Sequence, residues 1–132
     1  MKANIIKVNR QGFGVFTWGD SSRYVGEFYQ EEMHGQGIYQ YCNGSKYDGQ
    51  WENNQCHGKG VFTWRDGREY IGEYINDKKE GYGIFKWQDG REYRGNWQNG
   101  KQHGIGMYVA SNGLTRKGEW MQEKRLRWID DD

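Results

Sequence analysis

The chain has 132 residues, a length that fits one domain spanning 1–132, and a formal net charge of +1 at pH 7. A charge this small gives no strong overall field, so we expect no nucleic acid among the partners. Glycine supplies 21 residues and aromatic residues make up 17% of the chain, whereas proline is absent. This composition argues against helices and favours strands joined by tight turns, with aromatic rings providing most of the buried surface.

The sequence carries no signal for export or membrane insertion. Its first residues, MKANIIKVNR, lack the apolar core of a signal peptide, and no stretch approaches the roughly 18 apolar residues of a membrane span. Cys42 and Cys56 are the only cysteines, which is too few for a disulfide framework. We therefore expect free thiols and an intracellular, cytoplasmic protein.

A 23-residue pattern repeats along the chain. Each unit opens with an aromatic residue, a glycine and a second aromatic residue at alternate positions, continues with Gly-x-Gly and two more aromatic residues, and closes with a turn pair such as Asp-Gly. In chain order we predict a half-repeat at 11–23, full repeats at 24–46, 47–69, 70–92 and 93–115, and a divergent part-repeat at 116–128. So many positions in one frame exclude an accident of composition, and a fixed period of this kind is typical of repeat architectures.

Within a unit the pattern predicts two strands, as the unit 47–69 illustrates. Tyr47 and Trp51 alternate with a glycine between them, so all three face one side of the first strand. Residues 58–64 form the second strand with the same alternation, and residues 52–57 are expected to be the loop between the two. The chain folds back on itself in every unit, which predicts an all-β, elongated antiparallel meander.

The turn pair and the two faces of the sheet also follow from the pattern. Asp66-Gly67 is a signal for a two-residue type I′ turn. Because glycines alternate with the rings, we interpret the rings of neighbouring strands as lying over them. Glu27, Glu73 and Glu119 point to the opposite face, where we expect cross-strand ion pairs. That face also carries a thinner apolar stripe, formed by Val15, Ile38, Val61, Ile84 and Met107.

One segment carries a family resemblance. Residues 93–106 read YRGNWQNGKQHGIG, and together with the 23-residue period and the Asp-Gly pairs this segment resembles the MORN repeat. The resemblance covers residues 11–128 and implies an elongated, single-layer, twisted antiparallel sheet with a groove along its aromatic face. The sequence departs from the family pattern at Glu80, where other units have histidine, and at Arg116, where they open with tyrosine. Terminal repeats are usually atypical, so we expect the last unit to end differently.

The chain contains no catalytic motif: it has no phosphate-binding loop, dinucleotide-binding glycine pattern, kinase loop or hydrolase elbow. His34, His57 and His103 lie in different repeats, and a spacing of roughly 9–10 Å per repeat is too large for one zinc ion. Each is expected to hydrogen-bond within its own loop. Cys56 and its neighbour His57 are expected to point apart and not to form a nucleophile pair. We therefore expect a chain that is not an enzyme, with no catalytic residue, metal or cofactor.

The aromatic rows are the main candidate for a binding site. A single-layer sheet cannot bury both of its faces, so part of the groove is expected to stay open, and contiguous apolar surface usually marks an interaction site. The alternative is that the rings only pack on one another and on the glycines. The residues expected to contact a partner are Tyr24, Phe28, Tyr47, Trp51, Trp64, Tyr70, Tyr74, Trp87, Tyr93 and Trp97.

A basic cluster near the C-terminus is the second candidate site. It is either a solvated end of the rod or a patch for an acidic protein or anionic lipid head groups. The charges are also polarised: residues 11–56 carry six acidic and two basic side chains, and residues 93–128 carry two acidic and seven basic ones. This polarity leaves two alternatives open. In the first, two copies associate as a homodimer with the acidic end of one facing the basic end of the other, and in the second the chain is a monomer. The cluster consists of Arg116, Lys117, Lys124, Arg125 and Arg127.

These observations favour a protein-interaction scaffold whose groove holds a peptide or helix of a partner protein. The resemblance implies a cytoskeletal, ciliary or membrane-linked setting. Two alternatives stay open. The first is binding to a peripheral membrane or to phosphoinositides, and the second is a role as an accessory segment of a lipid kinase or methyltransferase.

Overall fold

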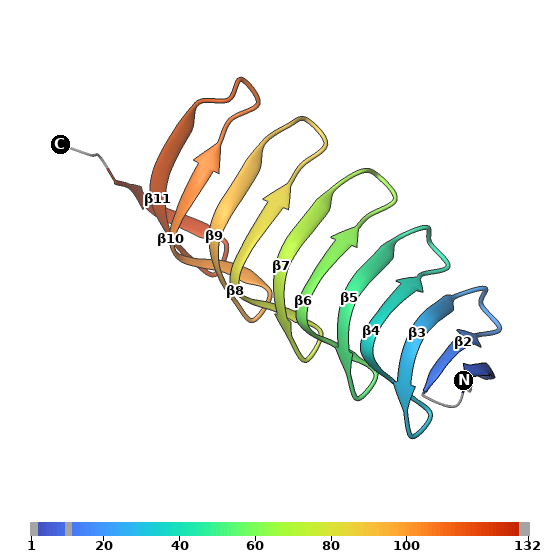
Figure 1. Ribbon diagram of the computed structural model, residues 1–132. Helices are drawn as coiled ribbons and strands as arrows, with labels where there is room; N and C mark the ends of the chain where they lie inside the picture. Colours follow the sequence, from blue (N-terminus) through green and yellow to red (C-terminus); the bar gives the residue numbers. More distant parts are fainter. Residues whose placement is uncertain (1–2, 10–11, 130–132) are drawn as a thin grey trace.

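The computed structural model of the chain describes residues 3–9 and 12–129 as one antiparallel sheet (Figure 1). Each strand pairs with the next one in the sequence, and the described residues contain no helix. The predicted all-β meander is thereby confirmed. The strands are β1 (Asn4–Asn9), β2 (Phe13–Thr17), β3 (Arg23–Tyr29), β4 (Glu32–Gln40), β5 (Lys46–Glu52), β6 (Gln55–Thr63), β7 (Glu69–Ile75), β8 (Lys78–Lys86), β9 (Glu92–Gln98), β10 (Lys101–Val109), β11 (Thr115–Met121) and β12 (Lys124–Trp128).

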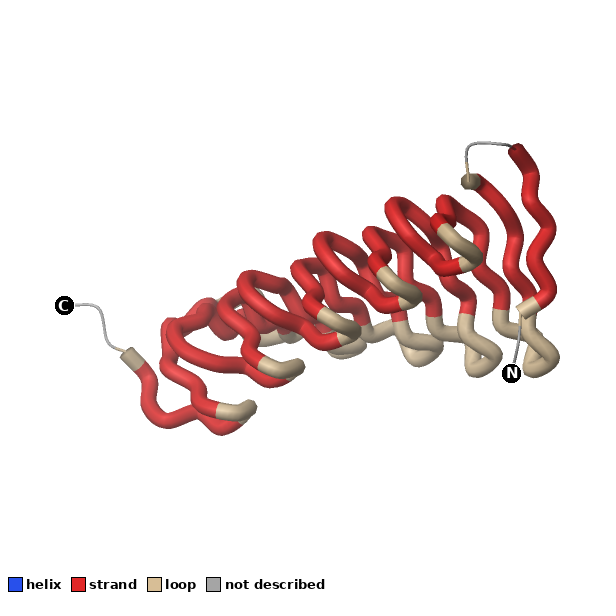
Figure 2. The backbone as a smooth tube through the Cα atoms, turned by 90° about the horizontal axis from the view of Figure 1, so that it is seen from below, coloured by secondary structure: helices blue, strands red, loops and turns tan. Residues whose placement is uncertain are grey.

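The sheet is elongated and curved. Its first and last strands lie at opposite ends of the molecule, and the strands run across the long axis (Figure 1). The hairpins follow one another along that axis and bend in the same sense (Figure 2). One face of the sheet is therefore concave and the other convex, and the buried aromatic residues form one cluster that extends from β2 to β11.

The concave face is built on tyrosine rings that lie over pairs of glycines. Gly49 in β5 faces Gly60 in β6, and the ring of Tyr47 covers both. Its hydroxyl donates a hydrogen bond to the carbonyl of Gln50 at 3.0 Å, and the side chain is fully buried. The interpretation of rings over glycines is confirmed, because only a residue without Cβ lets a ring approach the backbone this closely. The same arrangement recurs at Tyr24, Tyr70 and Tyr93.

The second aromatic residue of a unit joins it to the unit before. Trp51 donates a hydrogen bond from its indole Nε1 to the carbonyl of Gly37 in β4, at 3.0 Å. Its ring packs edge-to-face on Tyr24 of the preceding unit and on Tyr47 of its own, with centroids 5.4 and 5.1 Å away. Trp97 makes the equivalent contacts two units later. The repeats are therefore held in series by contacts between nearest neighbours.

The connection within each unit is shorter than the sequence predicted. β5 ends at Glu52 and β6 begins at Gln55, so the loop expected at 52–57 is the two-residue turn Asn53-Asn54. Both residues have a positive φ, 50° and 64°, as a type I′ turn requires. Asparagine tolerates a positive φ, so this turn needs no glycine. A search of the sequence for turn pairs that contain glycine therefore overlooks the turn. Equivalent turns with two positive φ angles fall at 30–31, 76–77, 99–100 and 122–123.

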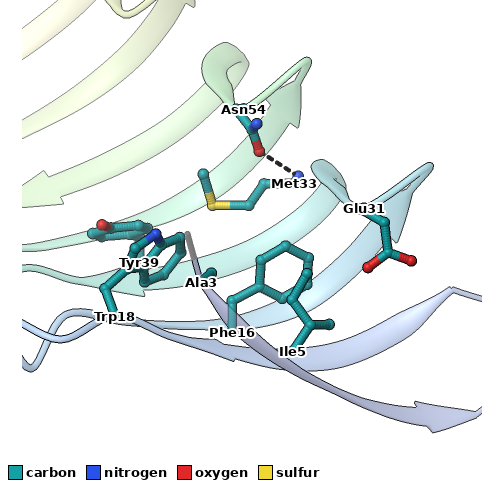
Figure 3. Close-up of a pocket in the computed structure, with 8 residues that line it drawn as sticks. All are labelled: Ala3, Ile5, Phe16, Trp18, Glu31, Met33, Tyr39 and Asn54. Carbon is teal, nitrogen blue, oxygen red and sulfur yellow. Dashed lines mark hydrogen bonds between the residues drawn. The ribbon is translucent and has the colours of Figure 1, made fainter. Parts of the chain in front are cut away.

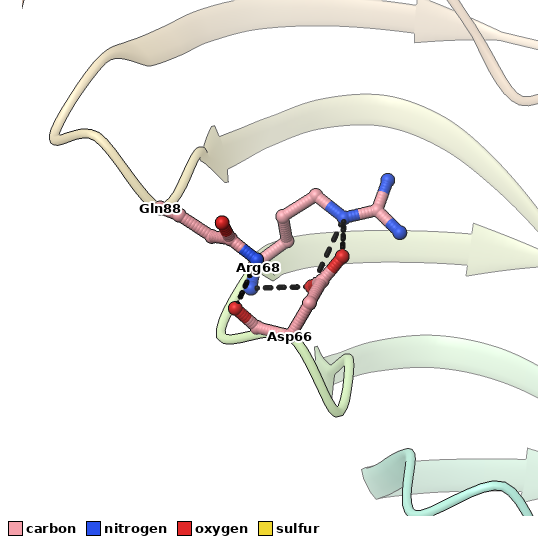
Figure 4. A network of polar contacts seen from close by, with 3 residues as sticks. All are labelled: Asp66, Arg68 and Gln88. Carbon is pink, nitrogen blue, oxygen red and sulfur yellow. Dashed lines mark hydrogen bonds and ion pairs between the residues drawn. The ribbon is translucent and has the colours of Figure 1, made fainter.

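The Asp-Gly pairs form a different turn from the one predicted. The N–H of Gly67, whose φ is 96°, donates to the carbonyl of Trp64 at 3.0 Å, and the N–H of Trp64 donates to the carbonyl of Arg68 at 2.9 Å. This is a three-residue loop closed by a glycine bulge. The type I′ prediction for Asp66-Gly67 is therefore wrong. Asp66 pairs with the guanidinium of Arg68 at 2.9 Å, and its carbonyl accepts a hydrogen bond from Gln88 of the next unit (Figure 4).

Acidic side chains of the convex face cap the backbone more than they form ion pairs. The carboxylate of Glu27 accepts a hydrogen bond from the backbone N–H of Gln36, at a break in the β3–β4 register. Gln50 accepts the equivalent N–H one unit later at 2.7 Å, so the role needs an acceptor and not a charge. The predicted ion pair is formed by Glu119, with Arg127 at 2.8 Å, whereas the carboxylate of Glu27 serves as a backbone acceptor.

β1 is a strand that the repeat pattern did not predict. It pairs with β2, and Ala3 and Ile5 pack against the aromatic cluster. The predicted half-repeat starts at residue 11, which lies outside the described residues. On the convex face, Val61 and Ile84 both pair with Ile71 of β7 and are half-buried, in agreement with the thinner apolar stripe.

Candidate binding groove

The aromatic rings of the concave face form two layers. Side chains of the lower layer are buried, because they pack on glycines and on one another, although Trp51 and Tyr74 reach the lining of a groove cavity. That these rings contact a partner stays a prediction. These rings are Tyr24, Tyr47, Trp51, Tyr70, Tyr74, Tyr93 and Trp97, none more than 6% exposed.

The upper layer is half-exposed and lines the groove. Of the predicted contact residues, Phe28, Trp64 and Trp87 belong to it. Most of this layer comes from the second strand of a unit or from the residues just after that strand. The second aromatic series of the repeat is therefore the signal that would have identified it. The half-exposed rings that the prediction omitted include Trp18, Tyr39, Tyr41, Phe62 and Tyr108.

A cavity of about 700 Å³ opens at the N-terminal end of the groove (Figure 3). Apolar and aromatic side chains line it together with Glu31 and Asn54, and the backbone N–H of Met33 donates to the carboxamide oxygen of Asn54 at 2.8 Å. Glu31 brings a carboxylate to the lining and pairs with Lys7 at 2.8 Å. The cavity therefore combines an apolar floor with one acidic group. Its lining residues are Ala3, Ile5, Phe16, Trp18, Glu31, Met33, Tyr39 and Asn54.

A second cavity of about 430 Å³ adjoins the first and shares Met33, Tyr39 and Asn54 with it. Its lining includes the buried Cys56 and the turn residue Asp77, whose carboxylate accepts a hydrogen bond from the N–H of Cys56 at 2.7 Å. The two cavities share lining residues and together extend over β1 to β8. The rings around the second cavity are Tyr39, Tyr41, Trp51, Phe62, Trp64 and Tyr74.

Lys79 lies among four aromatic rings of the groove. Its Nζ is 5.4 to 5.9 Å from the ring centroids of Trp64, Tyr70, Phe85 and Trp97. Desolvation by burial lowers the pKa of Lys79, whereas the faces of the rings attract its ammonium group. The groove is thus built to hold a cation in an aromatic setting.

The basic residues of the C-terminal cluster do not share one face. Alternation along β11 places Arg116 and Lys117 on opposite sides of the sheet, and alternation along β12 separates Lys124 from Arg125. The guanidinium groups of Arg116 and Arg125 both lie over the ring of Trp128, 4.5 and 4.4 Å from its centroid. The single patch expected from the sequence is therefore divided between the two faces.

The cysteines and histidines are not arranged for catalysis or metal binding. Within residues 3–9 and 12–129, no group of three or more His, Cys, Asp or Glu side chains would hold a metal ion. Burial raises the pKa of the Cys56 thiol, which makes it a poor nucleophile. His57 Nε2 lies 3.4 Å from a carboxylate oxygen of Glu52 in its own hairpin. The buried Nδ1 of His103 has no hydrogen-bond partner, so the expected bond is not made by that atom.

Curved hairpins that pack on their sequence neighbours and share a groove define a β-repeat protein. The MORN repeat family model matches the segments 9–23, 24–46, 47–67, 70–90 and 93–115, which together make up most of the chain. The chain belongs to the MORN-repeat family. No curated protein matches it. No helix among the described residues is long and apolar enough to cross a membrane.

Proposed function

We propose that the chain is a non-enzymatic interaction scaffold whose concave groove binds a segment of a partner protein. The observation that carries this proposal is the pair of adjoining cavities lined by half-exposed aromatic rings. Aromatic side chains often dominate the binding energy of interfaces, and contiguous apolar surface usually marks an interaction site. Membership of the MORN-repeat family supports an interaction role, in a cytoskeletal, ciliary or membrane-linked assembly.

The charge balance of the N-terminal part of the chain favours an amphipathic helix with basic residues at one end. Acidic side chains outnumber basic ones six to two over residues 11–56, and Glu31 lines the first cavity, whereas Asp77 lines the second cavity together with Lys78 and Lys79. Arg116 and Arg125 lie at the other end of the sheet. A helix would place apolar anchors in the cavities, as helices do in grooves of this kind, with its basic end over β3 to β6.

Replacing Trp64 with alanine is expected to weaken binding of such a segment about tenfold or more, because this half-exposed ring lines the second cavity. The probe is a basic amphipathic peptide selected from a displayed library on the wild-type chain, and calorimetry measures its affinity. Tyr82→Ala is the control, since Tyr82 is an exposed ring that lies outside both groove cavities. Equal affinities for the wild type and the Trp64 variant, or an equal loss with Tyr82→Ala, would contradict the groove.

Anionic lipid is a second candidate ligand, favoured by the two guanidinium groups that flank Trp128. Replacing Lys124, Arg125 and Arg127 with alanine is expected to abolish binding to phosphatidylserine vesicles, because each basic residue near a membrane contributes about 1 kcal/mol. Vesicle binding by the wild type should already weaken at high salt. The groove peptide should bind the triple variant normally. Salt-resistant vesicle binding by that variant would rule out the cluster as the lipid site.

A further inference from the structure

Lys79 shows which ligand chemistry the groove accepts. Its ammonium group sits in a cage of four rings contributed, in chain order, by Trp64, Tyr70, Phe85 and Trp97. Cages of this composition bind ammonium groups through the negative faces of the rings. In this unit the chain fills the cage with its own side chain.

The same cage is present one repeat earlier. Twenty-three residues before each ring stand Tyr41, Tyr47, Phe62 and Tyr74, with Cys56 in place of Lys79. The ring spacing is preserved. The first and third rings are 5.5 Å apart here and 5.3 Å apart around Lys79, and the second and fourth are 5.2 and 5.4 Å apart. The two cages therefore offer the same aromatic geometry.

The cage above Cys56 is open where the other is filled. A cysteine side chain is much shorter than a lysine side chain, so it leaves the upper part of the cage free. The cavity of about 430 Å³ occupies this space, and its lining includes Tyr41, Phe62, Tyr74 and Cys56 together with Lys78 and Lys79. One unit earlier the equivalent position is Met33, a longer side chain that is buried.

A carboxylate distinguishes this cage from its neighbours. Asp77 accepts a hydrogen bond from the N–H of Cys56 with one oxygen, so its charge lies at the cavity. Asp77 belongs to the turn that follows in the next unit. The equivalent turn residue beside Met33 is the neutral Asn54, and the one beside Lys79 is Gly100. Asp77 also offsets part of the repulsion that Lys78 and Lys79, which line the same cavity, exert on a second cation.

We propose that the cavity over Cys56 is a receptor for the ammonium group of a lysine side chain on the partner segment. This proposal rests on the proposed function, in which a basic segment lies in the groove. The ligand enters from the open side of the cage, packs its methylene chain between the rings and places its ammonium group among them beside Asp77. The lysine of the partner would make the same contact with this cage that Lys79 of the chain makes with the next one.

The test uses the full chain and two small probes, Nα-acetyl-lysine methylamide and its neutral analogue Nα-acetyl-norleucine methylamide, with nuclear magnetic resonance titrations of the aromatic signals. The lysine probe is expected to shift the signals of Tyr41, Phe62 and Tyr74, and the norleucine probe to bind at least tenfold more weakly. Cys56→Lys should fill the cage from within and weaken the lysine probe at least tenfold. Cys56→Met, which copies Met33, provides a second blocking variant if the lysine variant fails to fold.

Two further variants separate the cage from general charge effects. Asp77→Asn keeps the acceptor for the N–H of Cys56 but removes the charge, and it should weaken the lysine probe several-fold. Lys79→Cys should open a second cage and give two binding sites, whereas Lys59→Cys, which removes the same charge from an exposed residue outside the lining of the cavity, should leave one.

Equal binding of the two probes, or unchanged binding to folded Cys56→Lys or Cys56→Met, overturns the proposal. The helical groove peptide distinguishes this failure from failure of the proposed function. If that peptide binds the wild type and the Cys56 variants equally well, the groove function stands and the lysine receptor does not. If the lysine probe binds in the cage but no peptide depends on Trp64, the groove function fails alone.

Discussion

Replacing Gly83 with alanine is expected to lower the free energy of unfolding by about 3 kcal/mol, the upper range for an overpacked core. A Cβ at this position would lie 2.5 Å from both Cε1 and Cζ of the Tyr70 ring. The ring cannot withdraw easily, because its hydroxyl donates to the carbonyl of Glu73 at 3.0 Å and its face packs on Trp97. Urea unfolding followed by circular dichroism measures the loss.

Gly100→Ala is the matched control for this substitution. Gly100 has a φ of 82°, but a Cβ there would meet no atom within 4 Å, so only the backbone preference is lost, at about 1 kcal/mol. A double-mutant cycle with Tyr70→Ala isolates the ring contact, since Gly83→Ala should cost little once the ring is gone. If Gly83→Ala is as mild as Gly100→Ala, the close approach of ring and backbone is not what requires the glycine.

Unfolding at alkaline pH is the second large effect expected of this structure. Desolvation raises the pKa of Tyr24, Tyr47, Tyr70 and Tyr74 above the ordinary value of 10.0, and it raises the pKa of Tyr93 to about 12. Above pH 10 the folded chain therefore holds more protons than the unfolded chain, so stability is fully present below pH 10 and is lost as the pH rises. Above pH 10, each buried tyrosine lowers the free energy of unfolding by about 1.4 kcal/mol per pH unit. The five together lower it by about 7 kcal/mol per pH unit.

That loss matches the whole stability of a typical domain, roughly 5–15 kcal/mol, so the chain is expected to unfold between about pH 10 and 12. Lys79 makes the folded state more stable as the pH rises, because its pKa is lowered and the folded chain releases that proton before the unfolded chain does. This gain from one group is smaller than the loss from the five tyrosines. Circular dichroism and phenolate absorbance across the pH range report the transition.

Tyr74→Phe should move the midpoint of this transition to higher pH, because it keeps a buried ring and removes one hydroxyl. Tyr82→Phe is the control, since this ring is 55% exposed and should leave the midpoint unchanged. Phenolate formation near pH 10 without loss of structure would show that the tyrosine rings are not held as tightly as the packing over glycines implies.

Alternation in the sequence was sufficient to predict which residues share a face, but not how deeply they lie. Tyr47 and Trp64 both belong to the aromatic face. Tyr47 is buried because its strand places it directly over the paired Gly49 and Gly60, whereas Trp64 follows the end of β6 and lies above that layer. How deeply a ring is buried depends on whether a pair of facing glycines lies beneath it. The register between the two strands decides this, and the sequence of one strand alone does not contain it.

The turns and the first strand show the same limit. Asn53-Asn54 and Asp66-Gly67 are both acceptable turn sequences, and the hydrogen-bond register of the flanking strands decides which becomes the tighter two-residue turn. β1 lacks the alternating glycines and rings of the repeat, so no periodic signal marked it. The Lys79 cage was missed because its rings come from four positions in three successive units, which the sequence does not bring together.

The orientation of the strands has a mechanical consequence. Because the strands lie across the long axis, their hydrogen bonds run along it, and β1 and β12 lie at its opposite ends (Figure 1). Tension applied along the long axis pulls parallel to these hydrogen bonds. The strand pairs therefore separate one after another, and the bonds of many pairs do not break at the same time. Each unit that opens releases about 70 Å of chain. The molecule is therefore a compliant spring that lengthens in steps under low force, and single-molecule stretching would record those steps.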